Sequence, residues 1–247
     1  MLSKKSGLAM AAVVTALLVF TVSGFATAIP YNSGTAIPTV RFVGNVFATK
    51  AASSIIYAQS PDFQNVFASQ NDTITFGNYA TSFDNFTLGA SHNIDGFAWV
   101  GGYFNPPQKS VITGFTLTFY SDAGNQPGTV LATYSGAGNF GETFVGFDQF
   151  GDPLYAYSWT LAVPFAASAG TEYWASIVPD VGIPPQWGWG TSSSADHFAW
   201  QCFFGNCGSV PTDFAFALSA PVPEPGTLVL MGSGLLGLAG VIRRKLF

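Results

Sequence analysis

The chain contains 247 residues, of which 48% are hydrophobic, 16% are aromatic and only 9% are charged, and its formal net charge is −5 at pH 7. Typical soluble domains carry about 25% charged residues, so this composition is unusual for a cytosolic protein. The long middle part of the chain has no basic patch, which argues against nucleic acid as a partner.

Residues 1–28 have the organisation of a signal peptide. Lys4 and Lys5 form a positive region, residues 8–22 are apolar, and Ala26-Thr27-Ala28 offers the small-x-small pattern that signal peptidase cleaves. A permanent N-terminal anchor is the alternative, but the apolar stretch is short for that role. We therefore predict an exported chain that is processed by signal peptidase.

Residues 29–221 are long enough to form one domain with a sizeable core. They contain twelve acids and only three cations, Arg41, Lys50 and Lys109. The difference, 3 minus 12, leaves a net charge of −9 on this body. Together with the high content of aromatic and small polar residues, this balance is typical of an extracellular β-protein.

The dominant pattern in the body is the period-2 alternation of a half-buried strand. In residues 114–120, Phe115, Leu117 and Phe119 fall on one face, and residues 155–163 alternate in the same way. We predict strands at residues 40–48, 73–76, 83–88, 94–103, 114–120, 130–134, 143–147, 155–163, 173–178, 187–190, 198–201 and 214–218. Short strands with regular turn signals predict an all-β fold, an antiparallel β-sandwich of the jelly-roll or immunoglobulin-like type.

Cys202 and Cys207 are the only cysteines, and in an exported chain such a pair predicts a disulfide. Gly205-Asn206 is expected to supply the turn between them. A redox pair would favour two intervening residues, and a zinc site would need further ligands. So short a loop contributes about 2 kcal/mol in the chain-entropy model, so the bridge is expected to shape a loop.

The two histidines, His92 and His197, do not form a convincing catalytic group. Asp196 precedes His197, but neighbouring residues on a strand point to opposite faces. The chain has no G-x-S-x-G nucleophile elbow. We therefore expect no catalytic residues and no enzyme activity, and a secreted hydrolase is the less favoured alternative.

Asp148 and Asp152 are the acids that lie closest together outside any strand pattern. Such a five-residue loop offers carboxylate and carbonyl oxygens to Ca²⁺, although it lacks the D-x-[DN]-x-[DN]-G rhythm of a calcium loop. Most of the acids are expected to form turns. We assign no metal ligands, and a Ca²⁺ site stays possible without a position.

Trp187 and Trp189 are the candidate ligand-binding aromatics. They lie in P-P-Q-W-G-W-G, a segment that we expect to present an exposed patch able to stack on a sugar. The competing expectation is that a sandwich core buries one or two tryptophans, and Trp159 and Trp174 are the residues expected there.

Residues 222–247 contain three units in a fixed order. Pro223-Glu224-Pro225 is stiff and non-helical, residues 226–242 are uncharged and apolar, and Arg243-Arg244-Lys245 is cationic. The 17 apolar residues span about 26 Å as a helix, short but workable for a bilayer core of about 30 Å. We predict a transmembrane helix with the basic tail in the cytoplasm and the body outside; a buried helix of a soluble fold is the alternative.

This segment resembles the PEP-CTERM sorting signal of Gram-negative bacteria, also called the ice-binding protein C-terminal domain. The resemblance rests on Pro223, Glu224 and Pro225, the Gly/Leu-rich helix, and Arg243 and Arg244. It implies an exosortase substrate, anchored in the inner membrane as a precursor and then placed at the cell surface or in the extracellular matrix of a bacterium that makes exopolysaccharide.

The body is similar to the β-sandwich domains that accompany this signal. The matching pieces are I-D-G-F with G-G-Y-F, F-Y-S-D with P-G, E-Y-W, and W-G-W-G. This similarity supports the fold and the location only. From the two targeting ends, the β-sandwich body and the lack of a catalytic constellation, we expect an exported, surface-associated structural or adhesive protein, linked to exopolysaccharide or biofilm matrix. A carbohydrate- or Ca²⁺-dependent binding module is the alternative.

Overall fold

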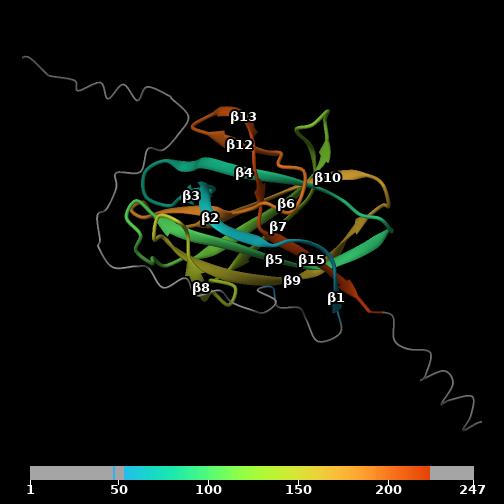
Figure 1. The fold of residues 1–247 in the computed structure, drawn as a ribbon, viewed down its shortest axis with the longest axis horizontal. Helices are drawn as coiled ribbons and strands as arrows, with labels where there is room; N and C mark the ends of the chain where they lie inside the picture. Colours follow the sequence, from blue (N-terminus) through green and yellow to red (C-terminus); the bar gives the residue numbers. More distant parts are fainter. Residues whose placement is uncertain (1–46, 48–52, 223–247) are drawn as a thin grey trace, which may run out of the picture. The chain divides into compact units, whose positions relative to one another are not determined.

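The computed structural model of the chain describes Phe47 and residues 53–222 (Figure 1). The predicted signal peptide, residues 1–28, and the predicted transmembrane helix, residues 226–242, lie outside these residues. Within the described part, no helix is long and apolar enough to cross a membrane. Every regular element there is a β-strand, so the all-β prediction is confirmed.

The strands form two sheets, of eight and seven strands. The strands are β1 (Ser53–Gln59), β2 (Pro61–Ala68), β3 (Gln70–Asp72), β4 (Gly77–Thr87), β5 (His92–Phe104), β6 (Gly114–Asp122), β7 (Pro127–Ala137), β8 (Thr143–Phe147), β9 (Pro153–Ala167), β10 (Glu172–Asp180), β11 (Gln186–Ser192), β12 (Ala199–Phe203), β13 (Asn206–Val210), β14 (Asp213–Phe214) and β15 (Phe216–Pro221).

The eight-stranded sheet is organised around β5. The first half of β5 pairs with β15, its second half pairs with β11, and β9 follows its opposite edge over most of its length. The seven-stranded sheet runs in the order β13-β12-β4-β3-β10-β6-β7. All pairings are antiparallel except one short contact between β3 and β10, so the antiparallel prediction holds, while the jelly-roll or immunoglobulin-like assignment stays a prediction.

The two sheets bury one aromatic core between them. Phe97, Trp99 and Tyr103 alternate along β5 and are buried on its inner face. From the other sheet, Phe115 packs edge-on against Trp99 with ring centroids 4.9 Å apart, and Phe119 packs against Phe97 at 6.1 Å. Pairs of this geometry contribute about 0.5–1.5 kcal/mol beyond the burial of their area.

The opposite face of β5 is also covered. Ala98 and Val100, which alternate with the aromatic residues, pack with Val66 of β2 and Val145 of β8 in a second cluster. A strand that is buried on both faces is a continuous apolar run rather than a strict alternation, which is the pattern of β5.

The structure contradicts the predicted strand at residues 73–76. This segment is a turn between β3 and β4, and Ile74 and Phe76 are exposed on it. Asp72 fixes the turn, because its carboxylate accepts hydrogen bonds from the backbone N–H groups of Ile74, Thr75 and Phe76. The β-prone residues of the segment are overridden by this side-chain cap.

We predict that Gly101→Ala destabilises the fold through overpacking. A Cβ at Gly101 would lie 2.1 Å from Cζ2 of Trp187 and 2.6 Å from the carbonyl oxygen of Gly188. Overpacking of a core costs about 1–3 kcal/mol, so the Tm should fall by about 2–12 °C for a body of this size. Gly89→Ala is the control, because its Cβ would have no neighbour within 4 Å. Equal Tm values for the two variants, measured by circular dichroism, would contradict the close packing described here.

Candidate functional site

The strand that leads into the predicted sorting segment is held on both edges. β15 pairs with β1 from Gln59↔Phe216 to Ser53↔Pro221, and it pairs with β5 from Trp99↔Phe216 to Gly96↔Ser219. Val222, the last described residue, is exposed. The sorting residues Pro223, Glu224, Pro225, Arg243 and Arg244 lie beyond it, outside the described residues.

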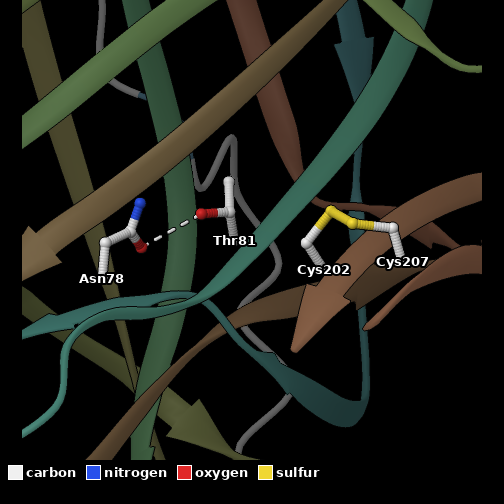
Figure 2. The surroundings of a disulfide bond; sticks show 4 residues. All are labelled: Asn78, Thr81, Cys202 and Cys207. Atoms are coloured by element: carbon white, nitrogen blue, oxygen red, sulfur yellow. Dashed lines mark hydrogen bonds between the residues drawn. A yellow bond between two sulfur atoms is a disulfide. The ribbon is translucent and has the colours of Figure 1, made fainter. Parts of the chain in front are cut away.

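The disulfide between Cys202 and Cys207 is confirmed. Figure 2 shows it joining the adjacent strands β12 and β13, where the two cysteines are directly paired. Beside it on β4, Thr81 is paired with Cys202 and donates a 3.1 Å hydrogen bond to the side chain of Asn78. The bridge therefore closes the hairpin at the edge of the seven-stranded sheet.

The tip of this hairpin differs from the expected Gly205-Asn206 turn. Phe203 pairs with Asn206, so the two turn residues are Phe204 and Gly205, with φ of 47° and 79°. Two successive positive φ values are typical of a type I′ hairpin turn, in which a phenylalanine is unusual. Such a conformation costs of order 1 kcal/mol and persists where the surrounding structure imposes it, here through the hydrogen bond from Phe204 N–H to the carbonyl of Tyr79.

The prediction that Trp187 and Trp189 form an exposed aromatic patch is wrong. Both side chains are 0% exposed. The Nε1–H of Trp187 donates to the hydroxyl of Tyr157 at 3.1 Å, and that of Trp189 donates to the carbonyl of Ala215 at 2.9 Å. The alternation of β11 explains this outcome, because the tryptophans point into the core and the small Gly188 points to the face where β2 approaches closely.

The tryptophans expected in the core divide between two environments. Trp174 is fully buried, and its Nε1–H donates to Asp122 at 3.0 Å. Trp159 is only partly buried and packs against Phe140, with ring centroids 4.4 Å apart.

Three exposed aromatic residues gather at the disulfide hairpin. Phe203 is 40% exposed, and Phe204 and Phe76 are each 54% exposed. Phe204 lies 5.5 Å from Phe76 and 5.0 Å from Phe203, measured between ring centroids in edge-on packing, and Tyr79 contacts all three rings. We call Phe76, Phe203 and Phe204 the hairpin aromatic patch; the sequence signal that could have revealed it is the Phe-Phe pair at a turn enclosed by two cysteines.

His197 is an exposed residue of the loop between β11 and β12. Its Nδ1 lies 3.7 Å from Asp213, which also accepts a 2.9 Å hydrogen bond from the His197 backbone N–H. Asp196 does not orient the imidazole, because its carboxylate accepts from the Phe198 N–H and from the Asn85 side chain. The nearby Ser192 hydroxyl donates to the Ser60 carbonyl. The described residues therefore show no serine–histidine hydrogen bond.

Two buried aspartates join the sheets near this loop. Asp84 of β4 accepts hydrogen bonds from the backbone N–H groups of Phe214 and Asn85, and Asp213 accepts from those of Ala195 and His197. Both aspartates are 0% exposed. Burial raises the pKa of Asp84 well above its usual range, and the Asp213 carboxylate adds to the rise.

Burial also raises the pKa of Asp213, together with the nearby Asp196. A pair of carboxylates suited to glycoside hydrolysis must flank a substrate in a cleft. Asp84 and Asp213 are instead sealed from solvent and used as acceptors for the backbone, which is a structural arrangement.

Asp196 and Glu172 are the acids that reach the surface of this region. They line a shallow pocket with Tyr57 and Asn85, and the Asn85 amide donates to both carboxylates, at 3.1 Å and 2.7 Å. In the part of the chain that the structure describes, no three or more histidine, cysteine or acidic side chains are grouped as a metal site.

A family model for the PEP-CTERM protein-sorting motif matches residues 221–245. The match begins at the last residue of β15 and contains the predicted Pro223-Glu224-Pro225 element and the Arg243-Arg244 pair. The chain therefore carries this sorting motif, as predicted, and the motif implies export, a membrane-anchored precursor and processing by an exosortase. No curated protein matches the chain.

We predict that the protein is most stable at mildly acidic pH. Burial, with the charge of Asp148, raises the pKa of Asp152 to about 6, and the pKa values of Asp84 and Asp213 are also raised. The stability that these groups contribute is present at low pH and is lost as pH rises through their folded pKa values. Burial alone would raise the pKa of Asp72 too, but hydrogen bonds from four backbone N–H groups outweigh it and lower that pKa, so its contribution is lost below about pH 4.

The expected result is a Tm that rises by about 2–5 °C from pH 8 to pH 5 and falls again below pH 4. Asp152→Asn should flatten the change between pH 5 and pH 7, because it removes the group that titrates there. A Tm that increases steadily from pH 5 to pH 8 would contradict these assignments.

Proposed function

We propose that this chain is a non-catalytic structural or adhesive protein of the bacterial cell surface or extracellular matrix. The observation that carries the proposal is the direct continuity of β15 with the sorting motif, which begins at residue 221. The motif thus follows directly from a strand that is hydrogen-bonded on both edges. Such an attachment is suited to holding a folded body at the surface until an exosortase releases or transfers it.

The electrostatics of the body support a structural role over a catalytic one. Asp72, Asp84, Asp122 and Asp213 all have carboxylates that accept backbone N–H hydrogen bonds. Perturbed carboxylates in an enzyme are expected in an accessible cleft. Here the most strongly perturbed carboxylates are buried, where they connect loops and sheets.

We predict that replacing Pro223, Glu224 and Pro225 by alanine blocks processing while export continues. A membrane peptidase needs an extended backbone at the interface, and proline keeps the residue before it out of helix. The alanine variant should let the helix extend outward, since alanine has the highest helix propensity. In a host with an exosortase, a blot should show only the long form in the membrane fraction, with its body accessible to protease in intact spheroplasts. Surface biotinylation of intact cells should reach the processed parent chain.

The control for this experiment is a double substitution of Leu228 and Leu230 by alanine, which keeps the apolar run and the Pro-Glu-Pro element. This control should be processed like the parent chain. Processing of the triple alanine variant at the parental rate would show that the element is only a linker. A parent chain that is never reached by biotinylation would contradict the proposed surface location.

A second candidate function is carbohydrate binding, and the hairpin aromatic patch favours it. Two of the three exposed phenylalanine rings, Phe203 and Phe204, lie at the tip of a hairpin that a disulfide closes, with Phe204 at positive φ. The third, Phe76, lies in the neighbouring turn between β3 and β4 and packs against Phe204. Aromatic faces stack on the apolar faces of sugar rings, and a rigid presentation limits the entropy lost on binding.

We predict that Phe203→Ser with Phe204→Ser lowers co-sedimentation of the protein with exopolysaccharide from an exosortase-containing host by at least about fivefold, the loss of roughly 1 kcal/mol of aromatic contact. The matched control is Phe144→Ser with Phe147→Ser, because these rings on β8 are 41% and 40% exposed but lie on a different strand. Loss in the first variant alone would identify a glycan-binding patch. Absence of co-sedimentation for the parent chain would reject this second candidate and leave the structural role.

A further inference from the structure

In two turns of this protein, both carboxylate oxygens of an aspartate accept hydrogen bonds, and Asp148 is an exception. Asp72 uses both carboxylate oxygens, since Oδ1 accepts from the N–H groups of Ile74 and Ile183 and Oδ2 accepts from the following turn. Asp122 also uses both, because Oδ1 accepts from Trp174 and Asn125 and Oδ2 accepts from Gly124.

At Asp148 only one carboxylate oxygen is used by the turn between β8 and β9. Oδ1 accepts from the N–H of Phe150 at 2.8 Å and from the N–H of Asp152 at 2.9 Å. Oδ2 accepts no hydrogen bond, and the residue is only 4% exposed, so water does not reach this oxygen freely. Among the described residues, the other buried side-chain atom without a partner is Nε1 of Trp99. This atom is a hydrogen-bond donor and does not bind a cation.

The carboxylate of Asp152 lies in the same turn, and it lacks hydrogen-bond donors among the described residues. The backbone N–H of Asp148 donates to the carbonyl of Asp152 at 3.0 Å, which brings the two ends of the turn together. The Asp152 side chain accepts no hydrogen bond from any described residue. The Asp148 carboxylate lies 2.9 Å from the backbone nitrogen of Asp152. Asp148 is buried and Asp152 is half-buried, so the turn holds two acidic residues that are partly withdrawn from water.

No basic side chain of the described residues is available to neutralise this pair. The described part of the chain has twelve acids and one lysine, and that lysine, Lys109, is paired with Glu142. A buried carboxylate that has no counter-charge, and one oxygen of which has no hydrogen bond, is costly. A cation from solution would supply the positive counter-charge that no basic side chain of the described residues provides.

We propose that Asp148 and Asp152 bind one Ca²⁺ ion at the turn between β8 and β9. Ca²⁺ takes six to eight oxygen ligands, and carboxylates, backbone carbonyls and water are its usual set. Since the described residues contain no group of three acidic or histidine ligands, carbonyls and water must complete the shell. The affinity should then fall near that of extracellular modules, with a Kd of about 10⁻⁴–10⁻³ M. This inference does not depend on the proposed surface role.

The test measures Ca²⁺ binding and thermal stability of the full chain purified in detergent at about pH 7.5. Ionic strength is held constant with NaCl while CaCl₂ is raised from zero to about 10 mM, so that general screening does not change. Equilibrium dialysis should show one Ca²⁺ per chain, and the Tm should rise by about 3–6 °C at the highest concentration.

Asp148→Asn separates a cation site from a structural role of the same carboxylate. The asparagine oxygen can still accept the two turn hydrogen bonds, and the amide nitrogen replaces the unpartnered Oδ2. The variant should therefore have a higher Tm than the parent without Ca²⁺ and should lose the response to Ca²⁺. Asp152→Asn leaves the backbone bonds of the turn unchanged and should weaken Ca²⁺ binding at least about tenfold, because it removes one of the two charged ligands.

Asp122→Asn is the matched control, because it changes a turn aspartate whose oxygens both have partners. Its Tm should fall while the response to Ca²⁺ remains. The proposal is overturned if the parent binds no Ca²⁺ over the whole titration, or if Asp148→Asn responds as the parent does. Stabilisation of the parent by acid alone, with no response to Ca²⁺, would show that a proton occupies the site and would also overturn the proposal.

Discussion

The fold depends on the close approach of strands around β5, which glycine makes possible. Gly101 leaves room for the indole of Trp187, and Gly188 allows β2 to pack against β11. Two large indoles can therefore enter the core while the backbones of three strands stay in contact. A side chain at either glycine would separate the strands or displace a tryptophan whose Nε1–H is already bonded, so packing and hydrogen bonding are satisfied together or lost together.

The scarcity of basic residues changes how the protein uses its acids. With one lysine among the described residues, most carboxylates cannot form ion pairs, and backbone N–H groups take the place of the missing cations. Asp72 shows this use in its favourable form, since it accepts from four N–H groups and its pKa falls. Asp84 shows the opposite balance, because desolvation outweighs its hydrogen bonds and its pKa rises. The same chemistry thus builds turns at the surface and makes sheet-to-sheet contacts sensitive to pH.

Strand positions were largely predictable where one face is buried. Residues 143–147 coincide with β8, and residues 114–120 and 155–163 lie within β6 and β9. The errors have physical causes. Residues 73–76 have β-prone side chains, but the Asp72 cap makes them a turn. β1 was missed because it lies in a stretch without long-range pattern and acquires its structure by pairing with β15, which is far away in the sequence.

Functional residues were predictable where they form a linear motif, and unpredictable where they form a surface patch that depends on the tertiary structure. The sorting motif is recognised as a linear segment, so the order of Pro-Glu-Pro, apolar run and arginines was sufficient to identify it. Cys202 and Cys207 were identified because two cysteines allow only one intramolecular pairing. Trp187 and Trp189 were misplaced because W-G-W-G is compatible with two structures. One is an exposed turn, and the other is a strand whose tryptophans face the core while its glycines face a neighbouring backbone. Only the position of β2 against the glycines decides between these alternatives, and the same tertiary arrangement leaves Phe203 and Phe204 exposed at the hairpin tip. A surface patch is therefore a property of what the fold leaves uncovered, which the local pattern of a sequence does not contain.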